Sequence, residues 1–236
     1  MNTHYLMFAS VLLVIVVLLW GCSQPSTAED ITPAPDINKY FSTPTDLTTP
    51  DAPQPISNVI CIDAGHGGYD AGAVYGNRQE KDDNLALALL VAFYIKEAGY
   101  TPLLTRTDDT FLSLSQRCEI ANQSNALLFL SVHRNSFKGA RGVEVWINSQ
   151  PSYQETMLAK NILSNLEKVG IQRNRGIKQG TQSSAKDDYV VNRDTDMPSC
   201  IIELGFMTDD TDNHLFDDNL NEYAKAIADA VISVLN

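Results

Sequence analysis

The sequence predicts a single α/β domain whose mostly parallel sheet is covered by helices on both faces. Strand-like apolar runs alternate with helical patterns from about residue 58 to the end, which is the order that a parallel sheet requires. The first run, Val59–Asp63, is mostly apolar, as strands are when both of their faces are buried. The chain has 236 residues, 44% of them hydrophobic, which suffices for one domain with a sizeable core and some appended segments.

Each expected element has a local signal. A loop with five glycines, Gly65–Gln79, follows the first strand and gives the backbone room to turn. Glu80 then begins a helix with apolar residues at helical spacing, and Gly99 stops it. The other expected helices are Leu114–Asn122, Gln154–Val169 and Leu220–Leu235. The other expected strands are Thr101–Thr105, Ala126–His133, Gly142–Asn148, Tyr189–Val191 and Cys200–Leu204.

The charge and the cysteines exclude some classes of protein. A formal net charge of −12 argues against nucleic-acid binding, because phosphates need a basic face, and against simple electrostatic docking on anionic lipids. Cys22, Cys61, Cys118 and Cys200 show no CxxC spacing, so a structural cysteine–zinc site is not expected. Cys61 and Cys200 lie in apolar runs, which predicts buried thiols, with a disulfide between them as the open alternative.

The N-terminus has the features of an export signal. The run from about Tyr5 to Trp20 is apolar and uncharged, and its length suits a signal peptide better than a membrane span. It ends at Gly21-Cys22 in a pattern that resembles a bacterial lipobox. We therefore expect residues 1–21 to be a lipoprotein-type signal peptide, with Cys22 carrying the lipid after cleavage. An uncleaved signal anchor is the alternative, because the first residues contain no Lys or Arg and Trp20 is bulky for its position.

Residues 22–57 are expected to be the lipidated cysteine and a disordered linker. Pro, Thr, Ser and Asp dominate this stretch, so it cannot bury enough apolar area to offset the entropy lost on ordering. Residues 58–236 remain as the one globular module. We expect the protein to be exported and to lie in the cell envelope, anchored to the outer face of the cytoplasmic membrane.

Two histidines stand where apolar strands become loops, and they suggest a metal site. His66 follows the first strand, and His133 ends the run Leu127–Val132. Two imidazoles and one carboxylate, with one open position, form a common hydrolytic zinc site, and Glu80 at the start of the next helix can supply the carboxylate. The alternatives for single residues are a surface histidine and a first-turn acid favoured by the helix dipole. His214 lies in an acidic run and is expected on the surface.

Glu203 is the remaining candidate for chemistry. It lies at a strand end between Ile202 and Leu204, where a carboxylate is costly to desolvate without a role or a partner. Partial burial would raise its pKa and suit it to move protons near neutral pH. The alternative is a buried structural salt bridge.

Taken together, these residues and their neighbours resemble the zinc-dependent N-acetylmuramoyl-L-alanine amidases. The resemblance covers essentially all of residues 58–236, with its blocks in the family's order. It implies a six-stranded sheet and hydrolysis of the amide between the lactyl group of N-acetylmuramic acid and L-alanine in peptidoglycan. The blocks are Asp63–Gly68, Glu80-Lys81, Thr105–Asp109, Leu114–Arg117, Ala121-Asn122, Ser131–Asn135, Gly142–Val145, Asn174–Gly176, Met197-Pro198 and Glu203–Phe206.

The resemblance also assigns roles to residues. It makes His66, Glu80 and His133 the ligands of one zinc ion. It makes Glu203 the catalytic carboxylate, which takes a proton from water and returns it to the departing nitrogen.

Four further residues are expected to support the site or the fold. Arg134 and Asn135 border the second histidine and are candidates for contact with the substrate. Glu144 is expected to support the zinc site or to contact a stem peptide. Arg117 is expected to pair with a carboxylate and to brace the sheet.

Some members of the family carry a helical insert after the second histidine that plugs the site until a partner removes it. Only Ser136–Arg141 fills this gap here, so we expect an open site and no obligate activator. Two other functions stay open at this point, a zinc peptidase that cuts peptide bonds in the wall and a wall-binding lipoprotein without activity. The four intact catalytic positions argue against the second.

Overall fold

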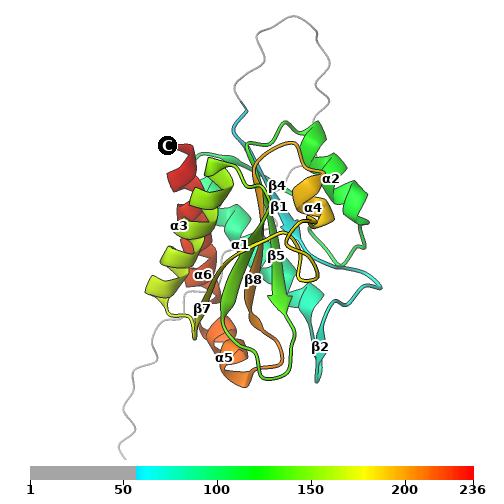
Figure 1. Ribbon diagram of the computed structural model, residues 1–236, viewed down its shortest axis with the longest axis vertical. Helices are drawn as coiled ribbons and strands as arrows, with labels where there is room; N and C mark the ends of the chain where they lie inside the picture. Colours follow the sequence, from blue (N-terminus) through cyan, green and yellow to red (C-terminus); the bar gives the residue numbers. More distant parts are fainter. Residues whose placement is uncertain (1–56) are drawn as a thin grey trace, which may run out of the picture. The chain divides into compact units, whose positions relative to one another are not determined.

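The computed structural model describes residues 57–236, which form an α/β domain (Figure 1). The expected signal peptide, Cys22 and nearly all of the linker lie outside the described residues. The strands are β1 (Val59–Ala64), β2 (Val74–Tyr75), β3 (Arg78–Gln79), β4 (Thr101–Leu104), β5 (Leu128–Asn135), β6 (Val143–Ile147), β7 (Asn174–Gln179) and β8 (Ser199–Phe206). The helices are α1 (Glu80–Glu97), α2 (Leu114–Gln123), α3 (Tyr153–Val169), α4 (Val190–Arg193), α5 (Asp210–Asp218) and α6 (Leu220–Leu235).

The main sheet has six strands in the order β4-β1-β5-β8-β6-β7. All neighbouring strands in it are parallel except β6 and β8, which pair antiparallel. The short strands β2 and β3 form a separate hairpin within the glycine-rich loop. The predicted mostly parallel sheet of about six strands is therefore confirmed.

Helices cover both faces of this sheet, as predicted (Figure 1). Alternate residues of a strand point to opposite faces, so each strand contributes to two cores. Ile62, Leu130 and Ile202 belong to the larger core, which α1, α3 and α6 close. Phe129 and Ile201 belong to a smaller core on the other face, under α2 and α4.

The cysteines follow the same alternation. Cys61 lies in the smaller core and Cys200 in the larger one, so the sheet separates them. Both are buried and free, as is Cys118 on α2, and burial raises the pKa of the Cys61 and Cys200 thiols far above the ordinary value. The expected burial is confirmed, and the alternative of a disulfide between Cys61 and Cys200 is excluded.

The structure corrects one predicted element. Tyr189–Val191 is not a strand, because α4 begins at Val190 and Val191 packs into the smaller core above the sheet. The β propensity of these residues is overridden by packing on the face of the sheet.

Four further elements, the strands β2, β3 and β7 and the helix α5, were not predicted from the sequence. The edge strand β7 has mostly polar residues, and the β2–β3 hairpin was assigned to a loop. Helix α5 lies in the acidic run, where the side chain of Asp209 caps it by accepting a hydrogen bond from the Asp212 N–H, with 3.0 Å between the atoms.

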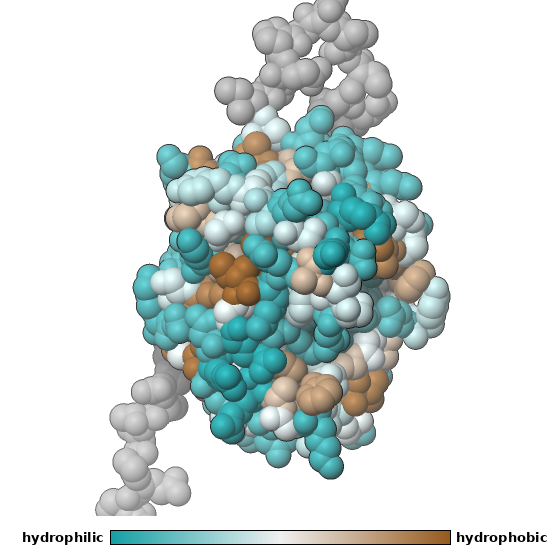
Figure 2. Space-filling model, in the orientation of Figure 1, coloured by the Kyte–Doolittle hydropathy of each residue, from teal (hydrophilic) through white to brown (hydrophobic). Residues whose placement is uncertain are grey.

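Within residues 57–236, no helix is long and apolar enough to cross a membrane. Figure 2 shows one face of the domain, which is mostly hydrophilic, with hydrophobic residues gathered in separate patches.

Candidate active site and metal centre

The candidate site lies at the carboxyl ends of β1, β5 and β8. The chain passes from β1 through α1 to β4 on one side, and β5 pairs with β1 on the other side. This reversal of strand order is the place where α/β proteins bind ligands. His66 follows β1 by two residues, while His133 on β5 and Glu203 on β8 are direct partners in the sheet. The structure therefore brings the predicted strand-end residues together.

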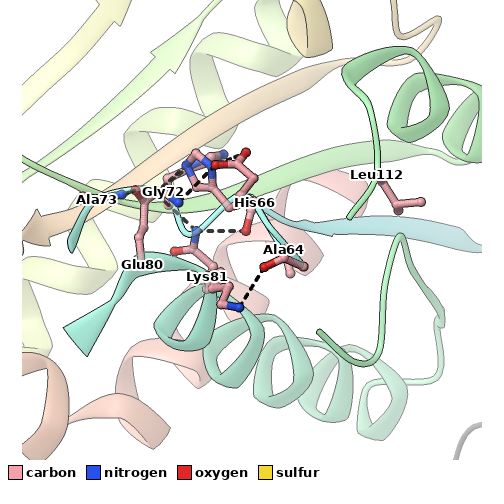
Figure 3. Close-up of polar contacts among 12 residues, drawn as sticks. Ala64, His66, Gly72, Ala73, Glu80, Lys81 and Leu112 are labelled. Carbon is pink, nitrogen blue, oxygen red and sulfur yellow. Dashed lines mark hydrogen bonds and ion pairs between the residues drawn. The ribbon is translucent and has the colours of Figure 1, made fainter. Parts of the chain in front are cut away.

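The three predicted metal ligands converge. Glu80, the first residue of α1, has its Oε1 atom 3.2 Å from His66 Nε2 and 2.8 Å from His133 Nδ1. One ligand atom of each residue lies within 4.8 Å of the others. Figure 3 shows His66 and Glu80 directed toward one another beside Gly72 and Ala73. Two imidazoles and one carboxylate at this spacing fit a single zinc ion with a position left for water.

The backbone of His66 is in an unusual conformation. Its φ angle is 61°, in the left-handed region that residues other than glycine rarely adopt. Arg117 donates hydrogen bonds to the carbonyl oxygens of His66 and Ala64 at 2.8 and 2.7 Å. Arg106 donates to the carbonyl oxygens of Ala64 and Gly65, both at 2.9 Å. Two buried guanidinium groups thus stabilise the strained turn that presents the imidazole.

Asp70 is a site residue that the sequence analysis missed. Its Oδ2 atom lies 2.8 Å from His66 Nδ1, so it fixes the ring and leaves Nε2 directed at Glu80. A carboxylate on the second nitrogen of a metal-binding histidine orients the ring and raises its basicity. The available signal was the spacing, since Asp70 stands four residues after His66 across a glycine turn.

Two glycines of the loop make room for the ligand side chains. A Cβ atom at Gly65 would collide with the ring of His133. At Gly72, where φ is 65°, a Cβ atom would lie 2.5 Å from His66 Cδ2 and 2.6 Å from Glu80 Oε2. Larger residues at these positions would displace the ligands themselves.

The charges of the ligands are strongly coupled. Burial alone would lower the pKa of His66, but its hydrogen bonds to Glu80 and Asp70 and their charges raise it to about 9. Burial would raise the pKa of Glu80, but the hydrogen bonds and charges of His133 and His66 hold it well below its usual range. The site therefore keeps its carboxylate ionised, as a metal ligand must be.

Glu203 lies beside the metal ligands and is poorly partnered. Its Oε2 atom is buried and accepts no hydrogen bond from the described part of the chain. Burial raises the pKa of Glu203 to about 7; the charges of His133 and His66 oppose this rise, and those of Glu80 and Glu144 add to it. No basic residue forms an ion pair with it among residues 57–236, so the alternative of a structural salt bridge finds no support there.

Glu144 and Asn135 form a neighbouring polar group. Glu144 lies opposite Glu203 in the sheet, and its Oε2 atom accepts a hydrogen bond from Arg175 Nε at 2.7 Å. Its Oε1 atom accepts hydrogen bonds from Asn135 Nδ2 and Trp146 Nε1, both at 3.1 Å. Glu144 is therefore a fixed negative charge next to Glu203.

Arg134 lies elsewhere than its position in the sequence suggests. Its side chain is 1% exposed and bonds to Asp83 at 2.7 Å and Asn213 at 2.8 Å, on the α1 side of the sheet. It cannot contact substrate at the cavity, which corrects that part of the expectation. Its backbone N–H donates to Glu80 Oε1 at 3.2 Å, so it supports a metal ligand through the main chain.

Two structural expectations are confirmed. Arg117 Nη1 lies 2.7 Å from Asp63 Oδ1, and both side chains are buried, so the arginine pairs with a carboxylate in the sheet. His214 is exposed on α5, on the surface.

A cavity of about 440 Å³ opens beside the ligands. His66, His133 and Glu203 form part of its lining, and the wall toward α2 and α4 is mainly apolar, with Phe111 and Val191 among its residues. Fold and site together define an α/β protein with a His–Glu–His group that has the ligand types and spacing of a metal site, and with a further carboxylate, Glu203, beside it at the carboxyl ends of the strands.

Comparison with known proteins identifies the family. The family model for N-acetylmuramoyl-L-alanine amidase matches residues 60–233, so the chain belongs to this family. Family membership supports hydrolysis of an amide in the peptidoglycan of the cell wall.

Individual relatives agree with this assignment. The uncharacterised protein YqiI of Bacillus subtilis is 38% identical over 185 residues, which cover 77% of this chain and 85% of YqiI. The N-acetylmuramoyl-L-alanine amidase LytC of the same organism is 31% identical over 185 residues, which cover 75% of this chain but only 36% of LytC. The solved catalytic domain of the amidase CwlV from Bacillus (Paenibacillus) polymyxa var. colistinus has a TM-score of 0.67 at 34% identity, covering 75% of this chain and 97% of that domain.

Proposed function

We propose that the protein is a zinc-dependent N-acetylmuramoyl-L-alanine amidase that hydrolyses the bond between the lactyl group of N-acetylmuramic acid and L-alanine. The proposal depends on the convergence of His66, Glu80 and His133, whose ligand atoms lie within 4.8 Å of one another. Glu203, whose buried Oε2 atom has no hydrogen-bond partner within residues 57–236, lies beside them on the neighbouring strand.

The roles of the residues follow from this arrangement. When bound, zinc supplies Lewis acidity, which lowers the pKa of a water toward about 7 and polarises a carbonyl. Glu203 accepts the proton of the attacking water and later gives it to the departing alanine nitrogen. Asp70 holds the ring of His66, and Glu144 supplies a negative charge that favours the protonated form of Glu203.

Replacing Glu203 by Gln tests the mechanism. The variant should keep its metal and lose turnover by about 10²- to 10⁴-fold, the usual contribution of a positioned general base. His66→Ala and His133→Ala should instead lose the metal, which elemental analysis of the purified protein measures. A Glu203→Gln variant with a near-native rate would refute the assignment of Glu203 as the general base.

Mass spectrometry of digested muropeptides tests the bond. Free stem peptides with an L-alanine N-terminus mean an amidase. Shortened stems would mean a peptidase, and an unchanged digest would mean a wall-binding protein.

We propose further that residues 1–21 export the protein and that Cys22 carries a lipid anchor in the cell envelope. The support is the lipobox-like pattern in the sequence. Cys22→Ser should abolish labelling by a clickable fatty acid and release the protein from the membrane fraction. Labelling that persists in this variant would refute the anchor site.

Hydrolysis should need no obligate activator. Residues 136–142 join β5 to β6 without a helix, and none of them lines the cavity. The purified protein with zinc should therefore digest purified peptidoglycan by itself. Inactivity that a second protein relieves would overturn this expectation.

A further inference from the structure

Two stacked aromatic rings stand at the edge of the cavity. The ring centroids of Tyr69 and Phe111 are 4.2 Å apart, with an angle of 27° between the ring planes. Phe111 is half-buried and lines the cavity, whereas Tyr69 is 82% exposed. Phe111 therefore backs one face of the tyrosine ring, and the rest of the ring is open to solvent.

The pair is fixed in place before any ligand arrives. Tyr69 lies in a tight turn in which Gly67 and Asp70 exchange backbone hydrogen bonds of 2.9 and 3.1 Å. The N–H of Gly68 donates to Asp109 at 2.8 Å, which ties this turn to the segment that carries Phe111. A rigid aromatic surface loses little entropy on binding, so it is suited to hold a ligand.

The aromatic pair lies close to the candidate metal site. Tyr69 stands three residues after His66, and the next residue, Asp70, bonds to His66. Since Phe111 and His66 line the same cavity, a molecule that rests on Tyr69 can extend to the candidate metal centre.

The charges around the pair favour a neutral ligand. Asp70 follows Tyr69 in the chain, and Asp108 and Asp109 stand shortly before Phe111. Lys81 donates a hydrogen bond to the carbonyl oxygen of Gly68, next to Tyr69, but its charge is paired with Asp109 at 2.6 Å. The guanidinium group of Arg106 donates hydrogen bonds to four backbone carbonyl oxygens. The acidic stem peptide of peptidoglycan is unfavourable here, whereas the glycan strand is uncharged wherever its lactyl carboxyl is amide-linked.

We propose that Tyr69, backed by Phe111, is a sugar-binding platform that takes a pyranose ring of the glycan strand. The C–H face of a pyranose is apolar and carries a small positive charge, which complements the face of an aromatic ring. The proposal deepens the proposed amidase function and rests on it. It also gives the catalytic domain its own contact with the cell wall.

The test compares two substrates that share the scissile amide. One is a glycan-bearing muropeptide, and the other is an N-lactyl-L-alanyl peptide without sugar. Tyr69→Ala should raise KM for the glycan-bearing substrate about three- to tenfold, as expected for the loss of one aromatic contact, and leave kcat and the lactyl-peptide kinetics unchanged. Tyr69→Phe should behave like the wild type. Tyr153→Ala is the matched control, because Tyr153 is 79% exposed on α3 and does not line the cavity.

Equal effects of Tyr69→Ala on both substrates, or no effect on either, would overturn the platform. A wild type that hydrolyses neither substrate would instead refute the amidase function. Calorimetric binding of N-acetylglucosamine oligomers, which have pyranose rings but no lactyl carboxylate, by the Glu203→Gln variant separates the two failures. In that background, Tyr69→Ala should weaken binding about three- to tenfold, and unchanged binding would refute the platform even if the amidase assay succeeds.

Discussion

Glu203 should reduce the stability of the fold that carries it. Burial raises the pKa of this carboxyl from 4.5 to about 7. Between these two values the folded protein keeps the proton that the unfolded chain releases, so stability falls as the pH rises through this interval. One pKa unit corresponds to about 1.4 kcal/mol, so at pH 8 the ionised group costs the metal-free protein about 3 kcal/mol.

Glu203→Gln removes this cost, because an amide does not ionise. The amide would itself find no partner where Oε2 has none, which costs about 1–3 kcal/mol at any pH. The variant should therefore be slightly less stable than the wild type at pH 5 and about as stable or more stable at pH 8. The change in this difference between pH 5 and pH 8 should be about 2–3 kcal/mol, because part of the cost is already present at pH 5, and it does not depend on how well the amide fits.

Urea unfolding of chelator-treated protein at pH 5 and pH 8, followed by circular dichroism, measures the difference. Glu155→Gln is the matched control, since Glu155 is a buried carboxylate that accepts hydrogen bonds from Asn148 Nδ2 and the Ser152 N–H, both at 2.6 Å. This control should lose stability at both pH values. If Glu203→Gln shows no gain in relative stability from pH 5 to pH 8, the reasoning about its burial is refuted.

Three further predictions concern the surroundings of the site. Asp70→Asn should weaken zinc binding about 10- to 100-fold, measured by competition with a chelating dye, because the ring of His66 loses its charged partner; unchanged affinity would exclude this role. Arg117→Met should lower the free energy of unfolding, measured by urea denaturation, by about 3–5 kcal/mol, because the buried charge of Asp63 loses its partner. Adding Asp63→Asn removes that charge and should restore part of the lost stability. The thiol of Cys61 should resist alkylation in the folded protein and react after unfolding in urea, because it is buried and its pKa is raised; rapid labelling under native conditions would contradict the described core.

The parts of the fold that the sequence predicts are those with strong apolar patterns. β1, β5 and β8 are nearly continuous apolar runs, and α1 has a clear start and stop, so their positions were predicted to within a few residues. β7 has one apolar residue, Ile177, because an edge strand needs little burial. α5 is stabilised by the cap at Asp209 and by Phe216, whose ring stacks under Arg134, and a single apolar anchor gives no periodic pattern.

The residues of the site also divide into those that the sequence predicts and those that it does not. The candidate ligands could be predicted because histidines and acids at strand ends are few and conspicuous. Arg106 and Arg117 could not be given their full role, since they act on the carbonyl oxygens of Ala64, Gly65 and His66 from 41 to 53 residues away. Any arginine can donate to a carbonyl, so the residue type carries no information about the partner.

Arg134 shows why adjacency in a strand misleads. Successive side chains of a strand point to opposite faces, so the immediate neighbour of a residue that faces the cavity is directed away from it. Ser131 and His133 both line the cavity, while Arg134 turns to the other face and bonds to Asp83. Along β5, the residues to test for contact with the substrate are therefore two positions from His133, and the residue next to it can act on the site only through its backbone, as the N–H of Arg134 does on Glu80.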